Sequence, residues 1–349
     1  MSTFESAKQG ASLKCPGCGG KLTFDPETQK LICGNCGNKY DEDEISEKTS
    51  SLKDDEVFDE ELKDYHCPSC GAEILGDQTT ATEFCVYCGS PVVFKGRVSG
   101  LLKPRYIIPF SVSKNKAKEC LKDYLKDYMF IPKSFFKEAN LEKMSGIYYP
   151  FWEADCDTVS KLSAEGVKIS SWTTGNRRYT EKKYFLIQRA GKIHFEDITV
   201  NALKGADKKL IESVLPYKID DHKDFKMEYL SGFHAKKNDL SFDDVNSEIK
   251  SKIGEYAKEV LLSTVDELYD NVEVTSTKSE ITAKSHDYVM LPVWVLCYKY
   301  RGKTYTFAVN GTTGKVFGEI PLSKGKLFAT FGSIAAGLFA LISLIGGLL

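Results

Sequence analysis

The spacing of apolar residues predicts two amphipathic helices in the middle of the chain. In residues 111–130, apolar side chains recur every three or four positions, and Ser111 or Ser113 provides the N-cap. Residues 241–270 predict the longest helix, which is capped near Ser241 and carries apolar residues along one side. Each helix therefore presents one apolar face to a core.

Around these helices the pattern changes to runs of β-branched and aromatic residues. Residues 146–202 predict three or four antiparallel strands separated by turns, and residues 285–321 predict a β-meander. Helices and strands occur in blocks instead of alternating, which favours the α+β class over a doubly wound sheet. Residues 104–322 therefore form the predicted α+β body, a mixture of helices and antiparallel sheet that is large enough for its own core.

The C-terminal residues 327–349 contain no charged side chain over 23 positions. About 20 apolar residues are enough to span a bilayer, and a buried helix of a globular protein would be amphipathic instead of apolar all round. Lys324 and Lys326 precede this stretch, which favours a cytoplasmic N-terminal side. The pattern predicts one C-terminal transmembrane helix in a single-pass protein of the cell membrane, with its N-terminus in the cytoplasm.

At the other end of the chain, one four-cysteine pattern occurs twice. Each copy has two C-x2-C pairs that are separated by fourteen residues. Two such pairs at about this separation are typical of a tetrahedral zinc site with four thiolate ligands. Residues 1–40 and 66–98 therefore predict two zinc ribbons, each with one structural Zn²⁺ ion. The eight predicted metal ligands are Cys15, Cys18, Cys33, Cys36, Cys67, Cys70, Cys85 and Cys88.

Disulfides and rubredoxin-like iron are the alternatives for these eight cysteines. The first residues have no apolar signal-peptide core, and the spacing favours metal in a reducing compartment over a disulfide framework. A site with four thiolates has no open position, so we expect the metal to fold the module and not to catalyse a reaction. The other cysteines, Cys120, Cys156 and Cys297, are expected to be small buried hydrophobes.

Charge argues against a nucleic-acid surface. Residues 41–65, between the two ribbons, hold twelve carboxylates and three lysines, which predicts a solvated, flexible acidic linker. The whole chain has a net charge of −2, and we identify no stretch in which aromatic residues and arginines interleave. Phosphate binding requires clustered lysines and arginines. The ribbons are therefore predicted to be rigid knobs that dock proteins.

The body shows no recognisable active site. Glu153, Asp155 and Asp157 alternate along a predicted strand and so point to one face, where they offer either a cation site or, more simply, a solvated sheet surface. Cys156 and His194 would form a nucleophile and base only if the fold brought them together, and nothing in the sequence does so. We expect no enzyme activity, and a hydrolase with an unrecognised site is the lesser alternative.

Motifs along the whole chain resemble a known family. The paired CPxCG ribbons, "YIIPF", "IYYPFWEADCD", "LPVWVLCYKYRGKTYTFAVNGTTGKVFGEIPLSKGK" and the apolar C-terminus are similar to bacterial membrane-anchored TFIIB-type zinc-ribbon proteins, often labelled primosomal protein N′ or replication-helicase-like. The helicase label conflicts with this chain, which is short and has no Walker loop. Members encoded beside PspA-like and SPFH-type proteins are implicated in envelope stress. The resemblance implies metal ligation by the eight cysteines and transfers no catalytic residue.

Taken together, these patterns predict a tail-anchored, cytoplasmic-facing zinc-ribbon adaptor or scaffold that recruits protein partners to the bacterial membrane in the envelope-stress response. The expected partners are the lipid bilayer, through the C-terminal helix, together with PspA-like or SPFH-type proteins and another membrane protein. The alternative is a membrane-tethered nucleic-acid-binding, transcription-associated or replication-associated zinc-ribbon factor. A steep salt dependence of DNA affinity would distinguish the alternative from the adaptor.

Overall fold

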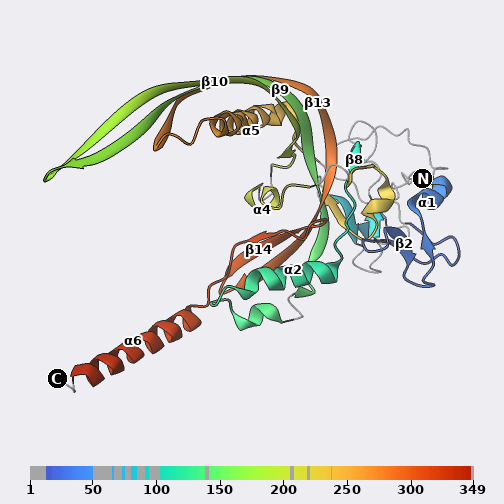
Figure 1. The fold of residues 1–349 in the computed structure, drawn as a ribbon. Coiled ribbons are helices and arrows are strands. Elements are labelled where there is room, and N and C mark those ends of the chain that lie inside the picture. Colours follow the sequence, from blue (N-terminus) through green and yellow to red (C-terminus); the bar gives the residue numbers. More distant parts are fainter. Residues whose placement is uncertain are drawn as a thin grey trace, which may run out of the picture.

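The protein is a mixed α+β molecule built around one large sheet (Figure 1). A long, curved arm of strands extends to one side of the body, and the N-terminal segment lies at the opposite side. The computed structural model of the chain describes residues 13–49, 65–66, 73–74, 80–84, 91–93, 103–137, 141–204, 208–217, 221–236 and 238–346.

Two strands of 30 residues form the centre of the sheet, β9 (Ser145–Thr174) and β13 (Asn271–Tyr300). They run antiparallel, and β10 (Arg177–Asn201) pairs with β9 along nearly its whole length. The register shifts between Phe195 and Ile198 in β10, and between Val274 and Ser276 and between Ala283 and Ser285 in β13. Residues 146–202 thus form two long strands where the sequence predicted three or four.

Shorter strands complete this ten-stranded sheet at the body end. Its main path has the order β11-β8-β13-β9-β12-β6-β7, while β14 pairs with β13 and with β15. The predicted β-meander at residues 285–321 is confirmed as β13, β14 and β15. The shorter strands are β6 (Thr80–Phe84), β7 (Pro91–Val93), β8 (Tyr106–Ile107), β11 (Lys223–Asp224), β12 (His234–Lys236), β14 (Lys303–Asn310) and β15 (Val316–Gly318).

Both predicted amphipathic helices are confirmed. Helix α2 (Lys114–Lys126) begins after Ser113, whose side chain accepts a hydrogen bond from the backbone of Lys116. Helix α5 (Phe242–Ser263) begins after Ser241 with a capping box. Short helical turns complete the body: α4 (Lys208–Glu212), η3 (Lys133–Phe136) and η5 (Met227–Leu230).

Buried apolar side chains form several clusters, of which the largest lies in the body. In the body, α2 and the strands bury an aromatic cluster in which the rings of Phe110 and Phe233 stack with centroids 4.2 Å apart. In the arm, α5 packs on β9 and β10 (Figure 1) and covers a second apolar layer, which includes Ala154, Cys156 and Ile253. The helix therefore supports only the half of the arm nearest the body.

The C-terminal segment requires a correction to the predicted fold class. Helix α6 (Lys324–Gly346) projects from the body and begins with two cationic residues, Lys324 and Lys326. Thr330 and Ser333 add hydroxyl groups, which donate hydrogen bonds to carbonyls of the same helix. Over the part of the chain that the structure describes, no helix is both long enough and apolar enough to cross a membrane. The prediction of a transmembrane helix at residues 327–349 is therefore wrong.

The segment between the N-terminal cysteines and the body is described only in part. Helix α1 (Glu42–Thr49) forms within the predicted acidic linker, and its Ile45 is buried. Two short strands, β4 (Tyr65–His66) and β5 (Glu73–Ile74), pair with each other. The predicted ligands of the second ribbon lie outside the described residues, namely Cys67, Cys70, Cys85 and Cys88.

Candidate metal centre

Two tight turns bring the four N-terminal cysteines together. Strands β1 (Leu22–Asp25) and β2 (Lys30–Cys33) connect these turns, and β3 (Lys39–Tyr40) completes an antiparallel sheet with them. Gly19 and Gly37 follow the second cysteine of each pair and adopt φ values of 70° and 75°. Residues with a side chain rarely adopt this left-handed conformation, so glycine makes both turns possible at low cost.

The sulfur atoms have the spacing of a tetrahedral zinc site. The Sγ atoms of Cys15 and Cys36 are 3.6 Å apart, and those of Cys18 and Cys33 are 3.5 Å apart. All four sulfurs lie within 4.8 Å of one another. Zn–S bonds of about 2.3 Å in a tetrahedron require sulfur atoms to be about 3.8 Å apart. The four thiolates therefore fit one Zn²⁺ ion and leave it no open coordination position.

Polar groups around Cys15 and Cys18 favour the deprotonated form of these two thiols. The Tyr40 hydroxyl lies 3.3 Å from Cys15 Sγ, and its hydrogen bond lowers the pKa of Cys15 to about 6. The backbone N–H of Gly20 and the side-chain amide of Asn35 both donate to Cys18 Sγ, and they lower the pKa of that thiol. A thiol must lose its proton to bind a metal. These donors therefore prepare the site for zinc.

The ribbon packs directly against the body. Leu22 and Phe24 belong to the same buried cluster as Tyr229 and Phe233 of the body, and the rings of Phe24 and Tyr229 meet edge to face at 5.2 Å. Burying a side chain of this size contributes about 2 kcal/mol. The Tyr229 hydroxyl also donates a 2.7 Å hydrogen bond to Glu42 of α1. The first ribbon thus has a fixed place on the body.

The fold and the sulfur geometry define this N-terminal unit as a zinc ribbon. The TFIIB zinc-binding family matches residues 13–54, which contain the first of the two predicted ribbons.

Over nearly its whole length, the chain is 31% identical to the uncharacterized protein YdjG of Bacillus subtilis (strain 168). The similarity extends over 334 residues, which are 96% of this chain and 97% of YdjG. The chain therefore belongs to the YdjG family. No solved structure matches it.

The three single cysteines have different environments. Cys156 is buried, as predicted, Cys120 is half-buried, and Cys297 is exposed. The prediction for Cys297 is wrong because the side chains of its neighbours, Leu296 and Tyr298, point to the core and leave Cys297 on the opposite face of β13.

The structure keeps Cys156 and His194 apart. Cys156 lies under α5, whereas His194 Nδ1 lies 2.7 Å from the Asp157 carboxylate on the exposed face of the arm. Hydrogen bonds from His194 and Lys284 lower the pKa of Asp157, and the same pairing raises the pKa of His194. This group is a surface ion cluster and not a nucleophile with its base.

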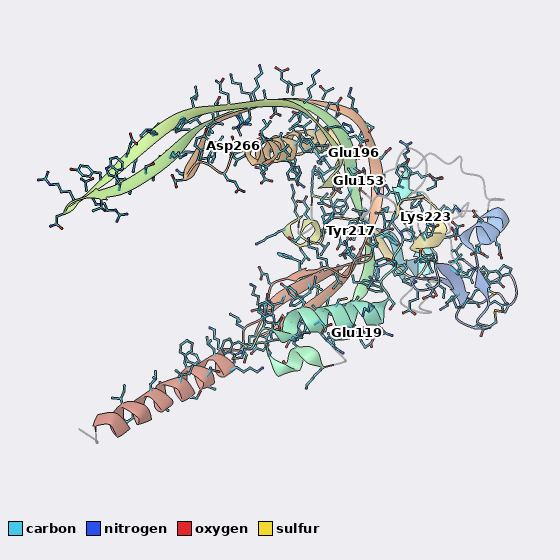
Figure 2. All side chains as sticks on the ribbon, viewed as in Figure 1. Glu119, Glu153, Glu196, Tyr217, Lys223 and Asp266 are labelled. Atoms are coloured by element: carbon cyan, nitrogen blue, oxygen red, sulfur yellow. The ribbon has the colours of Figure 1, made fainter. Side chains whose placement is uncertain are left out.

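Glu153 and Asp155 line a cavity that the sequence did not reveal (Figure 2 labels Glu153). Glu153 is buried, so the solvated-surface interpretation is wrong for this residue. His222 Nε2 lies 3.3 Å from Glu153 Oε2, and this contact raises the pKa of His222. The cavity measures about 330 Å³ and is lined by Tyr106, Glu153, Asp155, Asp197, His222, Ser285 and Asp287.

This cavity has no assigned ligand. Burial and the neighbouring Glu153 and Asp155 carboxylates raise the pKa of Asp197. The Ser285 hydroxyl and the Asp197 backbone N–H both donate to Asp155, so much of its hydrogen-bonding capacity is used within the protein. Within the described residues, three or more potential ligand atoms gather only at the four cysteines. The cysteine cluster is therefore the metal centre that the geometry supports.

Proposed function

We propose that the protein is a non-enzymatic zinc-ribbon adaptor, which recruits protein partners to the cytoplasmic face of the cell membrane in the envelope-stress response. The observation that carries this proposal is the closed set of four thiolates on a ribbon that is seated on the body. A metal in such a site has no position for a substrate. The metal instead stabilises the fold of the ribbon and so keeps the ribbon surface rigid.

The ribbon offers a surface suited to protein docking. Residues 16–19 and 34–39, which form the two metal-binding turns, are all exposed. They lie at the side of the molecule opposite the arm (Figure 1). A surface that is held rigid before binding loses little conformational entropy when a partner binds. The partners that we propose are PspA-like or SPFH-type proteins and another membrane protein, in keeping with the resemblance in sequence.

We also propose a second zinc ion, bound by Cys67, Cys70, Cys85 and Cys88. The support is their spacing, which repeats that of the first four cysteines. Metal analysis of the purified chain should find two zinc ions, and Cys67→Ser should remove one of them. A stoichiometry of one zinc ion, unchanged in Cys67→Ser, would leave the first ribbon as the sole zinc site.

Affinity purification of the full chain from cells tests the adaptor proposal. The double variant Cys15→Ser/Cys18→Ser removes two ligands of the first site, and we expect it to lose a partner that the wild-type chain recovers. Cys297→Ser is the matched control, because this exposed thiol lies outside the metal centre. Equal recovery of all partners by the double variant would contradict the proposal. Submicromolar DNA binding at physiological salt, lost in the same variant, would favour the nucleic-acid alternative.

A further inference from the structure

The outer end of the arm is a two-stranded hairpin with exposed side chains. Strand β13 pairs with β9 no further than Val167, and beyond this residue β9 pairs with β10 alone. The Asp270 carboxylate accepts a hydrogen bond from the Ile169 N–H at the base of this outer part. The hairpin turns at Gly175, where φ is 61°. Each residue from Lys168 to Leu186 is exposed. We refer to residues 168–186 as the arm tip. Because isolated two-stranded hairpins are only marginally stable in water, a surface that binds the arm tip would also stabilise it.

The arm tip is basic in a chain that is slightly acidic. It carries five basic residues and one acidic residue, a net charge of +4, whereas the whole chain has a net charge of −2. Within the described residues, Lys183 is the one basic side chain of the tip that forms an ion pair, with Glu181 at 3.3 Å. The basic residues are Lys168, Arg177, Arg178, Lys182 and Lys183.

Large apolar side chains lie among these charges. The rings of Trp172 and Tyr179 stack with centroids 5.9 Å apart, although half of the surface of each side chain is open to solvent. Leu186 is 76% exposed. The prediction that aromatic residues and arginines do not interleave is therefore wrong at this hairpin, where Arg177 and Arg178 lie between Trp172 and Tyr179. The exposed apolar residues are Ile169, Trp172, Tyr179, Tyr184, Phe185 and Leu186.

Cross-strand pairing leaves unfavourable contacts in the free arm tip. Lys168 and Lys183 lie directly opposite each other, and like charges in this position destabilise a strand pair. Their face of the hairpin also carries the Trp172–Tyr179 pair, since side chains two residues apart share a face. Side chains project from both faces of the arm (Figure 2). An anionic surface with an apolar interior would attract the lysines and would also bury the aromatic rings.

We propose that the arm tip binds the surface of an anionic phospholipid membrane. The inference rests on the membrane location in the proposed function and names the structural element that makes the contact. Tryptophan and tyrosine are enriched at the membrane–water interface. Lysine and arginine side chains are attracted to the negative surface potential of an anionic leaflet. The arm tip combines both features at the end of a projection that reaches beyond the body (Figure 1).

Two observations favour lipid over single-stranded nucleic acid as the ligand. Nucleic acid uses exposed aromatic rings for stacking on bases, but the exposed aliphatic side chains of Ile169 and Leu186 give it nothing to stack on. Helix α6 projects from the same side of the molecule as the arm (Figure 1) and exposes Phe328, Phe331 and Phe339. A lipid surface would bury the apolar side chains of the arm tip and those of α6 at the same time. The ribbon lies on the opposite side, where it stays free to bind protein.

Vesicle binding by the purified full chain tests this inference. The vesicles are made of phosphatidylcholine alone or of phosphatidylcholine with phosphatidylglycerol. We expect at least tenfold tighter binding to the anionic vesicles, and this preference should weaken as salt rises. The variant Arg177→Gln/Arg178→Gln/Lys182→Gln/Lys183→Gln should abolish the preference. The matched control replaces four exposed lysines outside the arm tip by glutamine, at Lys122, Lys126, Lys209 and Lys258, and should retain it.

Tryptophan fluorescence gives a second measurement at the arm tip itself. Addition of anionic vesicles should shift the emission of the wild-type chain to shorter wavelength, and Trp172→Phe should remove the shift. Zinc content and thermal unfolding show that each variant is folded. Equal affinity for both kinds of vesicle, or a preference that survives in the arm-tip variant, would overturn the inference. Tighter binding of a single-stranded oligonucleotide than of anionic vesicles would also overturn it. The affinity purification that tests the adaptor proposal uses no vesicles. A failure of the vesicle experiment would therefore leave the adaptor proposal untouched.

Discussion

The hydroxyl of Ser231 donates a 2.7 Å hydrogen bond to the backbone carbonyl of Leu22, and this buried contact joins the body to the zinc ribbon. The backbone N–H of Phe24 donates to the carbonyl of the same serine at 2.9 Å. One edge of β1 is thus hydrogen-bonded to Ser231 of the body, and the strand also pairs with β2 of the ribbon. The ribbon and the body are therefore expected to unfold as one cooperative unit.

Ser231→Ala is expected to destabilise the whole chain. The substitution leaves the buried Leu22 carbonyl without its donor, and an unsatisfied buried group costs about 1–3 kcal/mol. Urea unfolding followed by circular dichroism would measure the change. Exposed Ser171→Ala in the arm is the matched control and should have little effect. A free energy of unfolding equal to that of the wild type would show that the contact does not join the two parts.

Gly20→Ala is expected to weaken zinc binding. A Cβ atom at this position would lie 2.8 Å from Asn35 Cβ and 3.0 Å from Cys33 Sγ, so a ligand or its neighbour must move. Gly34→Ala is the control in the same ribbon, because its Cβ would meet no atom within 4 Å. Competition with a chromogenic chelator should show a lower affinity for Gly20→Ala alone. Similar losses in both variants would contradict the geometry of the site.

Tyr40→Phe should lower zinc affinity most strongly in acid. Loss of the phenol removes the hydrogen bond that lowers the pKa of Cys15, so protons compete better with the metal. Loss of such an outer partner typically costs about 10–100-fold in affinity. Chelator competition at pH 6 and at pH 8 measures the effect. Tyr256→Phe, a change at an exposed tyrosine of α5, serves as the control. A loss that is equal at both pH values would argue against a role through the Cys15 thiol.

The His222–Glu153 pair is expected to stabilise the fold at low pH. Because the pKa of His222 is raised in the folded state, its contribution is fully present below the unfolded pKa of about 6.5 and is lost as pH rises through the folded value. The free energy of unfolding of His222→Gln should therefore fall below that of the wild type in acid and approach it in alkali. Urea titrations at several pH values measure this difference. A difference in the free energy of unfolding that grows with rising pH would contradict a stabilising contact between protonated His222 and Glu153.

Local sequence patterns were sufficient for the elements whose signals lie close together in the chain. Ser113 and Ser241 mark helix starts because a cap acts within one turn. The spacing of Cys15, Cys18, Cys33 and Cys36 predicts a metal site because each tight turn fixes two sulfurs.

Long-range features could not be predicted in this way. Gly166 and Gly191 look like turn residues in sequence, yet each lies inside a long strand. An added Cβ at Gly166 would approach Ile187 and Tyr269 within 3 Å, so this glycine permits close packing of the arm. The seating of the ribbon depends on a contact between Leu22 and Ser231, which are 209 residues apart. No local pattern encodes such a contact.

The local charge and aromatic content of the sequence do distinguish the arm tip from the rest of the chain. The segment "WTTGNRRYTEKKY", residues 172–184, interleaves three aromatic and four basic residues around one hairpin turn. Counting charge over the whole chain averages this segment with the acidic linker. A window of about the length of a hairpin would have revealed it.

Hydrogen–deuterium exchange with and without a zinc chelator tests the central claim most directly. The claim is that zinc shapes the ribbon and keeps it seated on the body. Removal of the metal should increase exchange in residues 13–40 and also in body residues 225–233, which contact the ribbon. Exchange in α5, which lies in the arm, should be unchanged. An increase confined to residues 13–40, or no increase at all, would contradict the claim.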